Sequence, residues 1–572
     1  MKYLVSLFLA FILITSGSLY SQNFDEGLEL YNSEQFEEAY QVFSQLSDDR
    51  AILFSGKALL ALGEPVQAIN YFDTLTENQN EGLRQEAVYS KALAHYRLKN
   101  YNLSLHLLKE LLESDDRTAI RRDTQRLYDQ QLQFLSERQR FEILYYATSP
   151  TLRYDLVRAS RNHVDDNTYQ LLVNELIKRI TDTTQKERIE RELLSLRAEG
   201  SENLFPEAPE GTVYNIGVVL PAFEPEDAEF TIPRNLYYGM LIAADEFNSR
   251  NSSKKVQLIF KNSAEDPDTT ASALTELVWA RQIDAVLGPL FSQPASRMAR
   301  LTEEYRIPML APLANADDLN LDYNYTFQMN PTFEIHGKMM ARHAVNELRL
   351  DTLAVITETD SPTRSSAVAF RHEAERLGAH ISYFIEGDFE ATGFDLSEYT
   401  EVFTTDEALI DSLGYTTSDG IYAPFTGQAA STLINLFLND LEAMGNEAVI
   451  LGSEEWANIS LTNFQRQHFE IYYTESFGEA ADEETIEFFI EDYETRFGSS
   501  PDRFSKLGYD SANILFRSLE TAGNPEYLVH VLRSQPPYNG LSLLVDFDDK
   551  RINQHVYIRP LTNRAKSRMG VD

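Results

Sequence analysis

The sequence contains no cysteine, and its 572 residues include only ten histidines and two tryptophans. The lack of cysteine excludes disulfide bonds, thiol catalysis, thiolate metal sites and a lipid-modified N-terminal cysteine. Basic residues are scarce as well: 50 Lys and Arg stand against 89 Asp and Glu, which gives a net charge of −39. A surface of this sign repels phosphates, so nucleic acid is not an expected partner. The protein must be held together by burial alone, which a chain of this length allows.

The motifs of common catalytic and cofactor sites are also missing. The sequence has no glycine-rich phosphate loop, no HExxH, no GxSxG and no histidines clustered at metal-binding spacing. The acidic run Asp546–Asp549 lacks the glycine and the twelfth-position acid of a calcium loop, so it fits a hairpin turn better. We therefore expect a protein that is not an enzyme and that uses neither a metal nor another cofactor.

The N-terminal residues 1–22 have the pattern of a cleavable signal peptide. Lys2 precedes an apolar stretch from about Leu4 to Ile14, and small and polar residues follow it. About 11 apolar residues are too few to cross a bilayer, which takes about 20. We expect cleavage near residues 18–22 and export to the periplasm, without a lipid anchor because there is no cysteine to modify.

Residues 23–197 are predicted to be helical throughout, and three stretches share a pattern of small and bulky residues. The positions concerned are Gly27, Ala39 and Phe43, then Gly56, Ala68 and Phe72, then Ala92, Ser104 and Leu108. Small residues at the first two positions let two helices pack closely, and the bulky residue fills the groove between helical hairpins. The pattern resembles the tetratricopeptide repeat, although the units are unevenly spaced around the usual ~34 residues. Generic amphipathic hairpins are the alternative.

A change of pattern separates these helices from the rest of the chain. Residues 198–212 are rich in Gly, Pro, Glu and Ser and are predicted to be a linker. From residue 213 onward, short and continuously apolar runs alternate with amphipathic helices. Continuous apolarity is typical of strands that are buried on both faces, as in parallel sheets. The sequence therefore predicts an all-α repeat domain followed by a doubly wound α/β domain over residues 213–572.

Residues 213–572 resemble type I periplasmic binding proteins of the leucine/isoleucine/valine-binding class. The matching stretches occur in the family's order and include IGVVLP, YYGMLIAADEFN, AVLGPLFSQPASRMARLTEEYRIPMLAPLANADDL, DGIYAPFTGQAASTLI, VILGSEEWAN and YNGLSLLVDFDDKRINQHVYI. The resemblance implies two α/β lobes joined by three crossover segments, with a ligand bound in the cleft between them. It places the first lobe at about 213–330 and 478–525. The second lobe would comprise about 331–477 and the C-terminal end.

The ends of two predicted strands carry the candidate binding residues of the first lobe. Ligands of open parallel sheets bind beyond the carboxyl ends of the strands, where helix N-termini offer free N–H groups. Ser292 follows one such strand, and Asn315, which stands where the family usually has threonine, follows the next. The resemblance implies that Ser292, Asn315 and the backbone of Leu313 and Ala314 hold a ligand carboxylate. A Ser292 side chain that merely caps its own helix is the alternative.

The second lobe supplies the remaining candidates. The resemblance implies that Glu454 pairs with a ligand ammonium and that Tyr422 and Phe425 form aromatic cleft walls. Glu454 could equally be a solvated acid beside Glu455, and Tyr422 could be a core residue. The stretch 361–366 departs from the family, which often has a ligand-stacking tyrosine there, because it carries no aromatic residue.

Two functions from different classes follow. The first is a solute-binding protein that captures a small polar, amino-acid-like solute for an ABC transporter and recruits a protein partner through its helical repeats. The second is an envelope scaffold with a vestigial cleft, because repeats joined to this fold are similar to the outer-membrane activators of penicillin-binding proteins, which act in peptidoglycan synthesis. Those activators are lipoproteins, which this chain cannot be.

Overall fold

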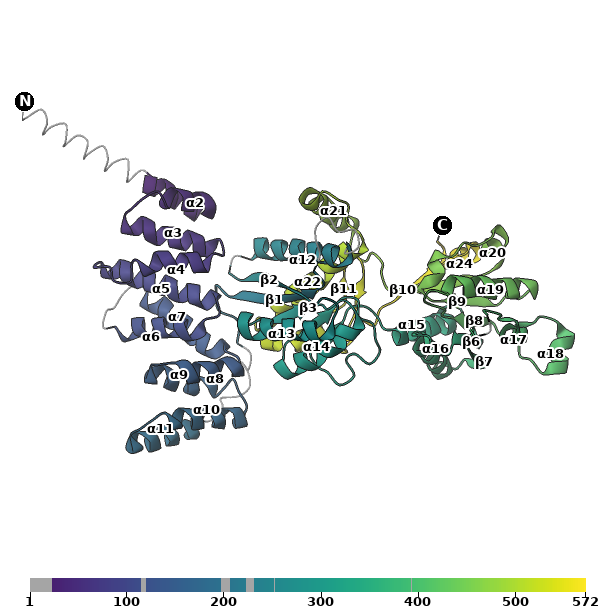
Figure 1. Cartoon of the computed structure of the whole chain (residues 1–572), viewed down its shortest axis with the longest axis horizontal. Helices are drawn as coiled ribbons and strands as arrows, with labels where there is room; N and C mark the ends of the chain where they lie inside the picture. Colours follow the sequence, from purple (N-terminus) through teal and green to yellow (C-terminus); the bar gives the residue numbers. More distant parts are fainter. Residues whose placement is uncertain are drawn as a thin grey trace, which may run out of the picture. The chain divides into compact units, whose positions relative to one another are not determined.

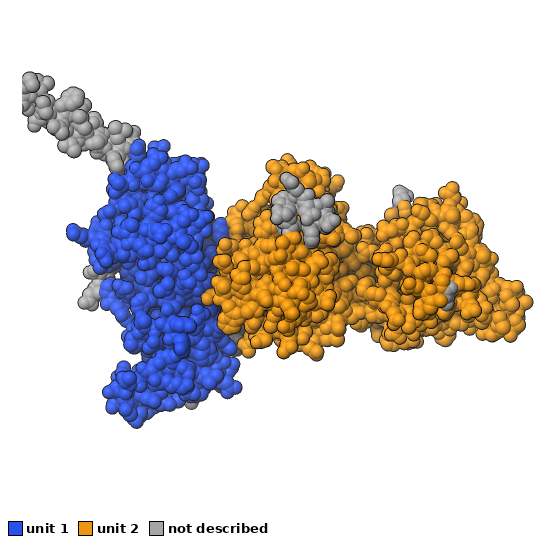
Figure 2. Space-filling view, viewed as in Figure 1, with its two compact units in different colours: residues 1–214, 251–255, 522–527 blue, residues 215–250, 256–521, 528–572 orange. Residues whose placement is uncertain are grey.

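The computed structural model describes residues 23–114, 120–196, 206–222, 231–251, 253–391 and 393–571 (Figure 1). The predicted signal peptide, 1–22, and residues 198–205 of the predicted linker lie outside these ranges. The chain divides into two compact units, which Figure 2 shows in two colours. Unit 1 comprises Met1–Tyr214, Asn251–Lys255 and Ala522–Tyr527, and unit 2 comprises Asn215–Arg250, Val256–Thr521 and Leu528–Asp572.

Every regular element described between residues 23 and 196 is a helix, and we call this part of unit 1 the helical domain. Residues 23–32 are helical. The helices that follow are α2 (Phe36–Phe43), α3 (Asp49–Ala61), α4 (Pro65–Asp73), α5 (Glu81–Arg97), α6 (Tyr101–Glu113), α7 (Arg121–Phe134), α8 (Glu137–Tyr146), α9 (Pro150–Ser160), α10 (Asp166–Lys178) and α11 (Thr183–Ser195). Helices α2 to α7 pack each against the next.

The close helix contacts predicted from the small residues are present. A Cβ atom added to Gly56 would lie 2.5 Å from the ring of Phe72, so only glycine allows this approach. The first of the three patterned stretches has the same kind of contact. In the third stretch, the Ser104 hydroxyl donates a 2.8 Å hydrogen bond to the carbonyl of Ala92. These contacts confirm the predicted packing, whereas membership of the tetratricopeptide family stays a prediction.

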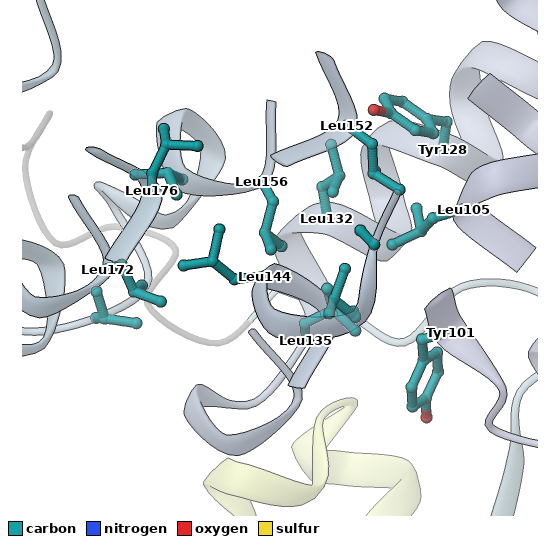
Figure 3. Packing of buried hydrophobic residues seen from close by; sticks show 14 of the residues in the cluster. Tyr101, Leu105, Tyr128, Leu132, Leu135, Leu144, Leu152, Leu156, Leu172 and Leu176 are labelled. Carbon is teal, nitrogen blue, oxygen red and sulfur yellow. The ribbon is translucent and has the colours of Figure 1, made fainter. Parts of the chain in front are cut away.

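One hydrophobic cluster runs through the helical domain from α5 to α11. Figure 3 shows part of it, with leucines from successive helices pointing toward one another. Leu105, Leu152 and Leu156 are completely buried. The cluster extends to Leu193, so the helices after residue 120 share a core with the third patterned stretch, whereas the first two stretches lie in separate clusters.

A five-stranded sheet forms the centre of what we call the first lobe of unit 2. Its strands are β1 (Val213–Leu220), β2 (Lys255–Asn262), β3 (Ala285–Leu287), β4 (Met309–Ala311) and β5 (Thr326–Gln328), in the order β2-β1-β3-β4-β5. The pairs β1–β3, β3–β4 and β4–β5 are parallel. All residues of the inner strands β3 and β4 are buried, as the continuous apolarity predicts, and the residues of the edge strand β5 are buried as well.

A six-stranded sheet forms the second lobe. Its strands are β6 (Thr352–Glu358), β7 (His380–Gly387), β8 (Gly420–Ala423), β9 (Val449–Gly452), β10 (Ile471–Glu475) and β13 (Tyr557–Pro560), in the order β13-β10-β9-β8-β6-β7. Strand β13 is antiparallel to β10, and the other pairs are parallel. A short separate ribbon pairs β11 (Tyr538–Asn539) with β12 (Leu544–Val545).

Helices cover both sheets (Figure 1). Those of the first lobe are α12 (Thr231–Arg250), α13 (Pro267–Arg281), α14 (Ser292–Tyr305), α21 (Glu483–Phe497), α22 (Arg503–Ala522) and α23 (Leu528–Ser534). Those of the second lobe are α15 (Phe333–Arg342), α16 (Arg364–Arg376), α17 (Ser397–Thr400), α18 (Glu407–Leu413), α19 (Ala430–Ala443), α20 (Asn463–His468) and α24 (Asn563–Met569).

The chain passes between the two lobes three times, as predicted: after β5, between β10 and α21, and between β12 and β13. Helix α22 returns to pack against α12, where a Cβ atom on Gly239 would overlap the carbonyl oxygen of Ser505. The first lobe continues past the predicted boundary at residue 525. The buried Asp510 accepts 2.8 Å hydrogen bonds from the N–H groups of Leu541 and Ser542, which ties the β11–β12 ribbon to α22.

Candidate functional site

The first candidate position lies where β3 ends and α14 begins. Gly288 has a φ of 102°, and a Cβ atom there would overlap the carbonyl oxygen of Val219 in β1. Only glycine therefore fits this bend. The bend brings the chain past the sheet edge and places Ser292 in the first turn of α14, at the carboxyl end of β3.

Ser292 does not cap its own helix. The N-cap residue of α14 is Phe291, which makes no side-chain cap. The Ser292 hydroxyl oxygen instead accepts hydrogen bonds from the N–H groups of Asn315 and Ala316, each 3.2 Å long. A hydroxyl has two lone pairs and one proton. Both lone pairs of Ser292 are thus engaged, and the O–H group can act only as a donor.

The loop after β4 contains the other first-lobe candidates, Leu313, Ala314 and Asn315. The carbonyls of Leu313 and Ala314 accept hydrogen bonds from the side-chain amides of Asn330 (3.0 Å) and Gln328 (3.3 Å). The N–H of Asn315 goes to Ser292 and is not free for a ligand. Within the described residues, the N–H groups of Leu313 and Ala314 have no assigned acceptor.

Ser292 and this loop therefore form one connected edge with unused donors. The donors are the O–H of Ser292 and the N–H groups of Leu313 and Ala314. Backbone N–H groups are rarely left without an acceptor, so a ligand or water is expected to complete them. The structure brings together the four residues that the sequence places at this edge.

Glu454 lies in the second lobe, directly after β9, in a short 3₁₀ helix (Glu454–Asn458). Its Oε2 accepts a long 3.5 Å hydrogen bond from the Ser476 hydroxyl, and its Oε1 lies 3.8 Å from Nη1 of Arg503 in the first lobe. The Glu454 side chain is 40% exposed. Burial raises the pKa of Glu454, and the positive charge of Arg503 partly opposes that rise. The carboxylate is therefore reachable and only weakly compensated.

Tyr422 and Phe425 do not form cleft walls in the structure. Tyr422 is completely buried, its ring stacks on Phe370 at 4.3 Å between centroids, and its hydroxyl lies 2.6 Å from that of Ser366. Phe425 is also buried and packs edge-to-face with Phe437 in a different core cluster. Both rings point into the packing between sheet and helices, so the core alternative holds for Tyr422, and Phe425 shares it.

Three residues near Glu454 were missed by the sequence analysis. Arg503 and Ser476 contact Glu454 as described, and the Nε2 atom of His336 lies 3.1 Å from the Ser476 hydroxyl. Burial lowers the pKa of His336 to about 4, although nearby Asp317 acts in the opposite direction. These residues come from α15, the crossover after β10 and α22, and no sequence spacing connects them.

Two further features bear on the kind of site. Among the residues that the structure describes, no helix combines the length and hydrophobicity needed to cross a membrane. Over the same ranges, no three His, Asp or Glu side chains converge as metal ligands would.

Comparison with known proteins gives one family and several distant structures. The model of the periplasmic binding protein family matches residues 232–566, which is more than half of the chain. No curated protein matches. A structure from Rhodospirillum rubrum, titled as a branched-chain amino acid ABC transporter, is 20% identical, with 61% of this chain and 98% of that chain covered and a TM-score of 0.49. An ABC transporter substrate-binding protein from Desulfitobacterium hafniense in complex with Leu is 19% identical, with coverages of 61% and 98% and a TM-score of 0.45. At these TM-scores and identities, the ligands and partners of those proteins cannot be assigned to this chain.

Proposed function

Because this chain belongs to the periplasmic binding protein family, we propose that it is an exported, non-catalytic protein that binds a small zwitterionic solute between its lobes. The observation that carries this proposal is the opposite polarity of the two strand-end positions. Ser292, Leu313 and Ala314 present donors, and Glu454 presents a carboxylate. Donors suit a ligand carboxylate, and a carboxylate suits a ligand ammonium, which together describe an amino acid.

The donor end is prepared for an anion before a ligand arrives. The backbone of the β4 loop holds Ser292 so that its proton must point elsewhere, and α14 adds the positive end of its dipole at the same place. A hydrogen bond to a charged group contributes about 1.5–3 kcal/mol. Loss of the Ser292 hydroxyl should therefore weaken binding about tenfold to a hundredfold.

The Glu454 carboxylate, which is the acceptor end of the proposed site, can exchange Arg503 for a ligand. The contact between Glu454 and Arg503 is 3.8 Å long and partly exposed, so it is a weak ion pair. A ligand ammonium in direct hydrogen-bonding contact would compensate the Glu454 carboxylate better than Arg503 does. Such a ligand should lower the pKa of Glu454, which burial now raises.

Calorimetry of the full-length protein against a panel of amino acids tests the proposal. Ser292→Ala and Glu454→Gln should each weaken binding at least about tenfold. Matched controls are Ser296→Ala, one turn along the exposed side of α14, and Glu455→Gln beside Glu454. The proposal is wrong if a ligand binds and the controls weaken binding as much as the site variants do.

The envelope scaffold is the second candidate, and Arg503 is the observation that favours it. Arg503 of the opposite lobe already compensates part of the charge of Glu454, so this carboxylate does not require a ligand. In this case no amino acid would bind the wild type, and the helical domain would carry the activity. A purified penicillin-binding protein would then bind full-length protein, and Glu454→Gln would not change that binding. We propose in either case that the helical domain recruits a protein partner.

A further inference from the structure

A groove of about 630 Å³ lies on the helical domain, a size typical of ligand-binding pockets. It is lined by residues of α6, α9, α10, α11 and the turn before α11. Its charged lining residues are Lys109, Arg153, Arg179, Arg188, Asp155 and Glu192. Basic residues thus prevail in this groove, although the chain as a whole has a net charge of −39.

Two of the four cations are held by acids of the domain itself. Lys109 Nζ lies 2.8 Å from an Asp155 carboxylate oxygen. Arg179 donates a 2.7 Å hydrogen bond to the Glu175 carboxylate. These pairs fix the side chains in place and leave little charge for a ligand.

The other two cations, Arg153 and Arg188, have no such partner. Over residues 23–114 and 120–196, no hydrogen bond or ion pair is assigned to either guanidinium. The Nε atom of Arg153 is buried without an acceptor. Burial and the neighbouring charge of Arg179 both lower the pKa of Arg153. A buried donor without an acceptor costs folding free energy, and no acceptor for this Nε atom is assigned in the described part of the domain.

We propose that this groove binds an acidic peptide segment of a partner protein, whose carboxylates pair with Arg153 and Arg188. A guanidinium binds a carboxylate through two parallel hydrogen bonds, so a ligand carboxylate would supply the missing acceptor for the buried Nε of Arg153. Leu176, Ile180 and Ile189 also line the groove and offer apolar contacts for the side chains between the acids. The groove therefore fits a segment that mixes acidic and apolar residues. This inference deepens the proposed recruitment of a partner and does not depend on the solute site.

Fluorescence anisotropy with the full-length protein tests the proposal. The probe is a fluorescein-labelled peptide of alternating glutamate and leucine, and the reference peptide has lysine in place of glutamate. Arg153→Met and Arg188→Met should each weaken binding of the acidic peptide about tenfold or more, because each removes a charge-assisted contact. The matched control is Arg158→Met, which removes an exposed arginine of the same helix α9 and should leave binding unchanged.

Thermal unfolding separates this role from a structural one. Arg153→Met removes a buried unpaired donor, so the melting temperature should stay the same or rise while peptide binding is lost. A fall in melting temperature for Arg153→Met, together with unchanged peptide binding by Arg188→Met, would overturn the proposal.

Three other results would also refute it: no binding of the acidic peptide to the wild type, equal binding of the lysine peptide, or equal loss in Arg158→Met. Displacement of the peptide by an equal concentration of inorganic phosphate would indicate a small-anion site instead. Ser292→Ala and Glu454→Gln should bind the acidic peptide like the wild type. A failure of the solute site is thereby distinguished from a failure of this groove.

Discussion

Acid should destabilise the second lobe through one buried histidine, His336. This residue of α15 is 9% exposed, and its Nε2 atom lies 3.1 Å from the Ser476 hydroxyl. Burial lowers its pKa from 6.5 to about 4. His336 is therefore neutral in the folded protein over a pH range in which an unfolded chain would protonate it.

The direction and the size of this loss of stability follow from proton linkage. The unfolded state takes up a proton as the pH falls through 6.5, whereas the folded state does so only near 4. The contribution of His336 to stability is complete above pH 6.5 and is lost as the pH falls toward 4. One pKa unit corresponds to about 1.4 kcal/mol, so the loss amounts to about 3 kcal/mol.

Urea unfolding followed by tryptophan fluorescence measures this loss. The chain has two tryptophans, and Trp456 is fully buried in the second lobe, so a Trp279→Phe background isolates its signal. Between pH 7.5 and 4.5 the protein should lose about 2.5 kcal/mol more stability than its His336→Gln variant. His380→Gln, which replaces an exposed histidine of β7, is the matched control and should follow the wild type. Parallel stability losses for the wild type and His336→Gln would refute the reasoning.

Three further predictions concern folding. Limited proteolysis should cut between residues 198 and 213 and yield two stable fragments, whereas one resistant fragment across this region would contradict independent folding. Gly337→Ala should lower the free energy of unfolding by about 1–3 kcal/mol in urea, because the added Cβ overlaps the carbonyl oxygen of Ser366. Gly82→Ala in helix α5, where an added Cβ has room, is its control and should leave the free energy of unfolding unchanged. Asp510→Asn should cost about 3 kcal/mol in the same assay, since an amide cannot accept the hydrogen bonds that both carboxylate oxygens receive, and an unchanged midpoint would show that they contribute little.

The strands could be predicted because their signal is local. A run such as Val213–Leu220 is apolar apart from Asn215, and the structure buries nearly all of it. The small residues of the helical domain are predictable for the same reason, since Gly56 is needed by a ring only 16 positions away. The three crossings between the lobes could be predicted only from the resemblance to a family, because no local pattern specifies which sheet a strand joins.

The site was predictable only in part, since side-chain partners depend on the register of distant segments. Ser292 follows from its place after a strand, but its bonds to Asn315 and Ala316 depend on how two loops meet. Arg503 reaches Glu454 only because the chain returns to the first lobe after β10. Tyr422 was misplaced because the direction of a side chain at a strand end depends on pleat and register rather than on sequence position.

The interleaving of the two lobes has a consequence for synthesis, which delivers the chain from its N-terminus. The helical domain relies on neighbouring helices and can fold as soon as it emerges. The first lobe must wait for α22 to cover α12, and the second lobe must wait for β13 to pair with β10. Helix α12 therefore keeps an uncovered face, and strand β10 an unpaired edge, until the C-terminal part of the chain has been made. During that interval the unfinished lobes expose apolar surface that chaperones and proteases recognise, whereas the helices ahead of them are already folded.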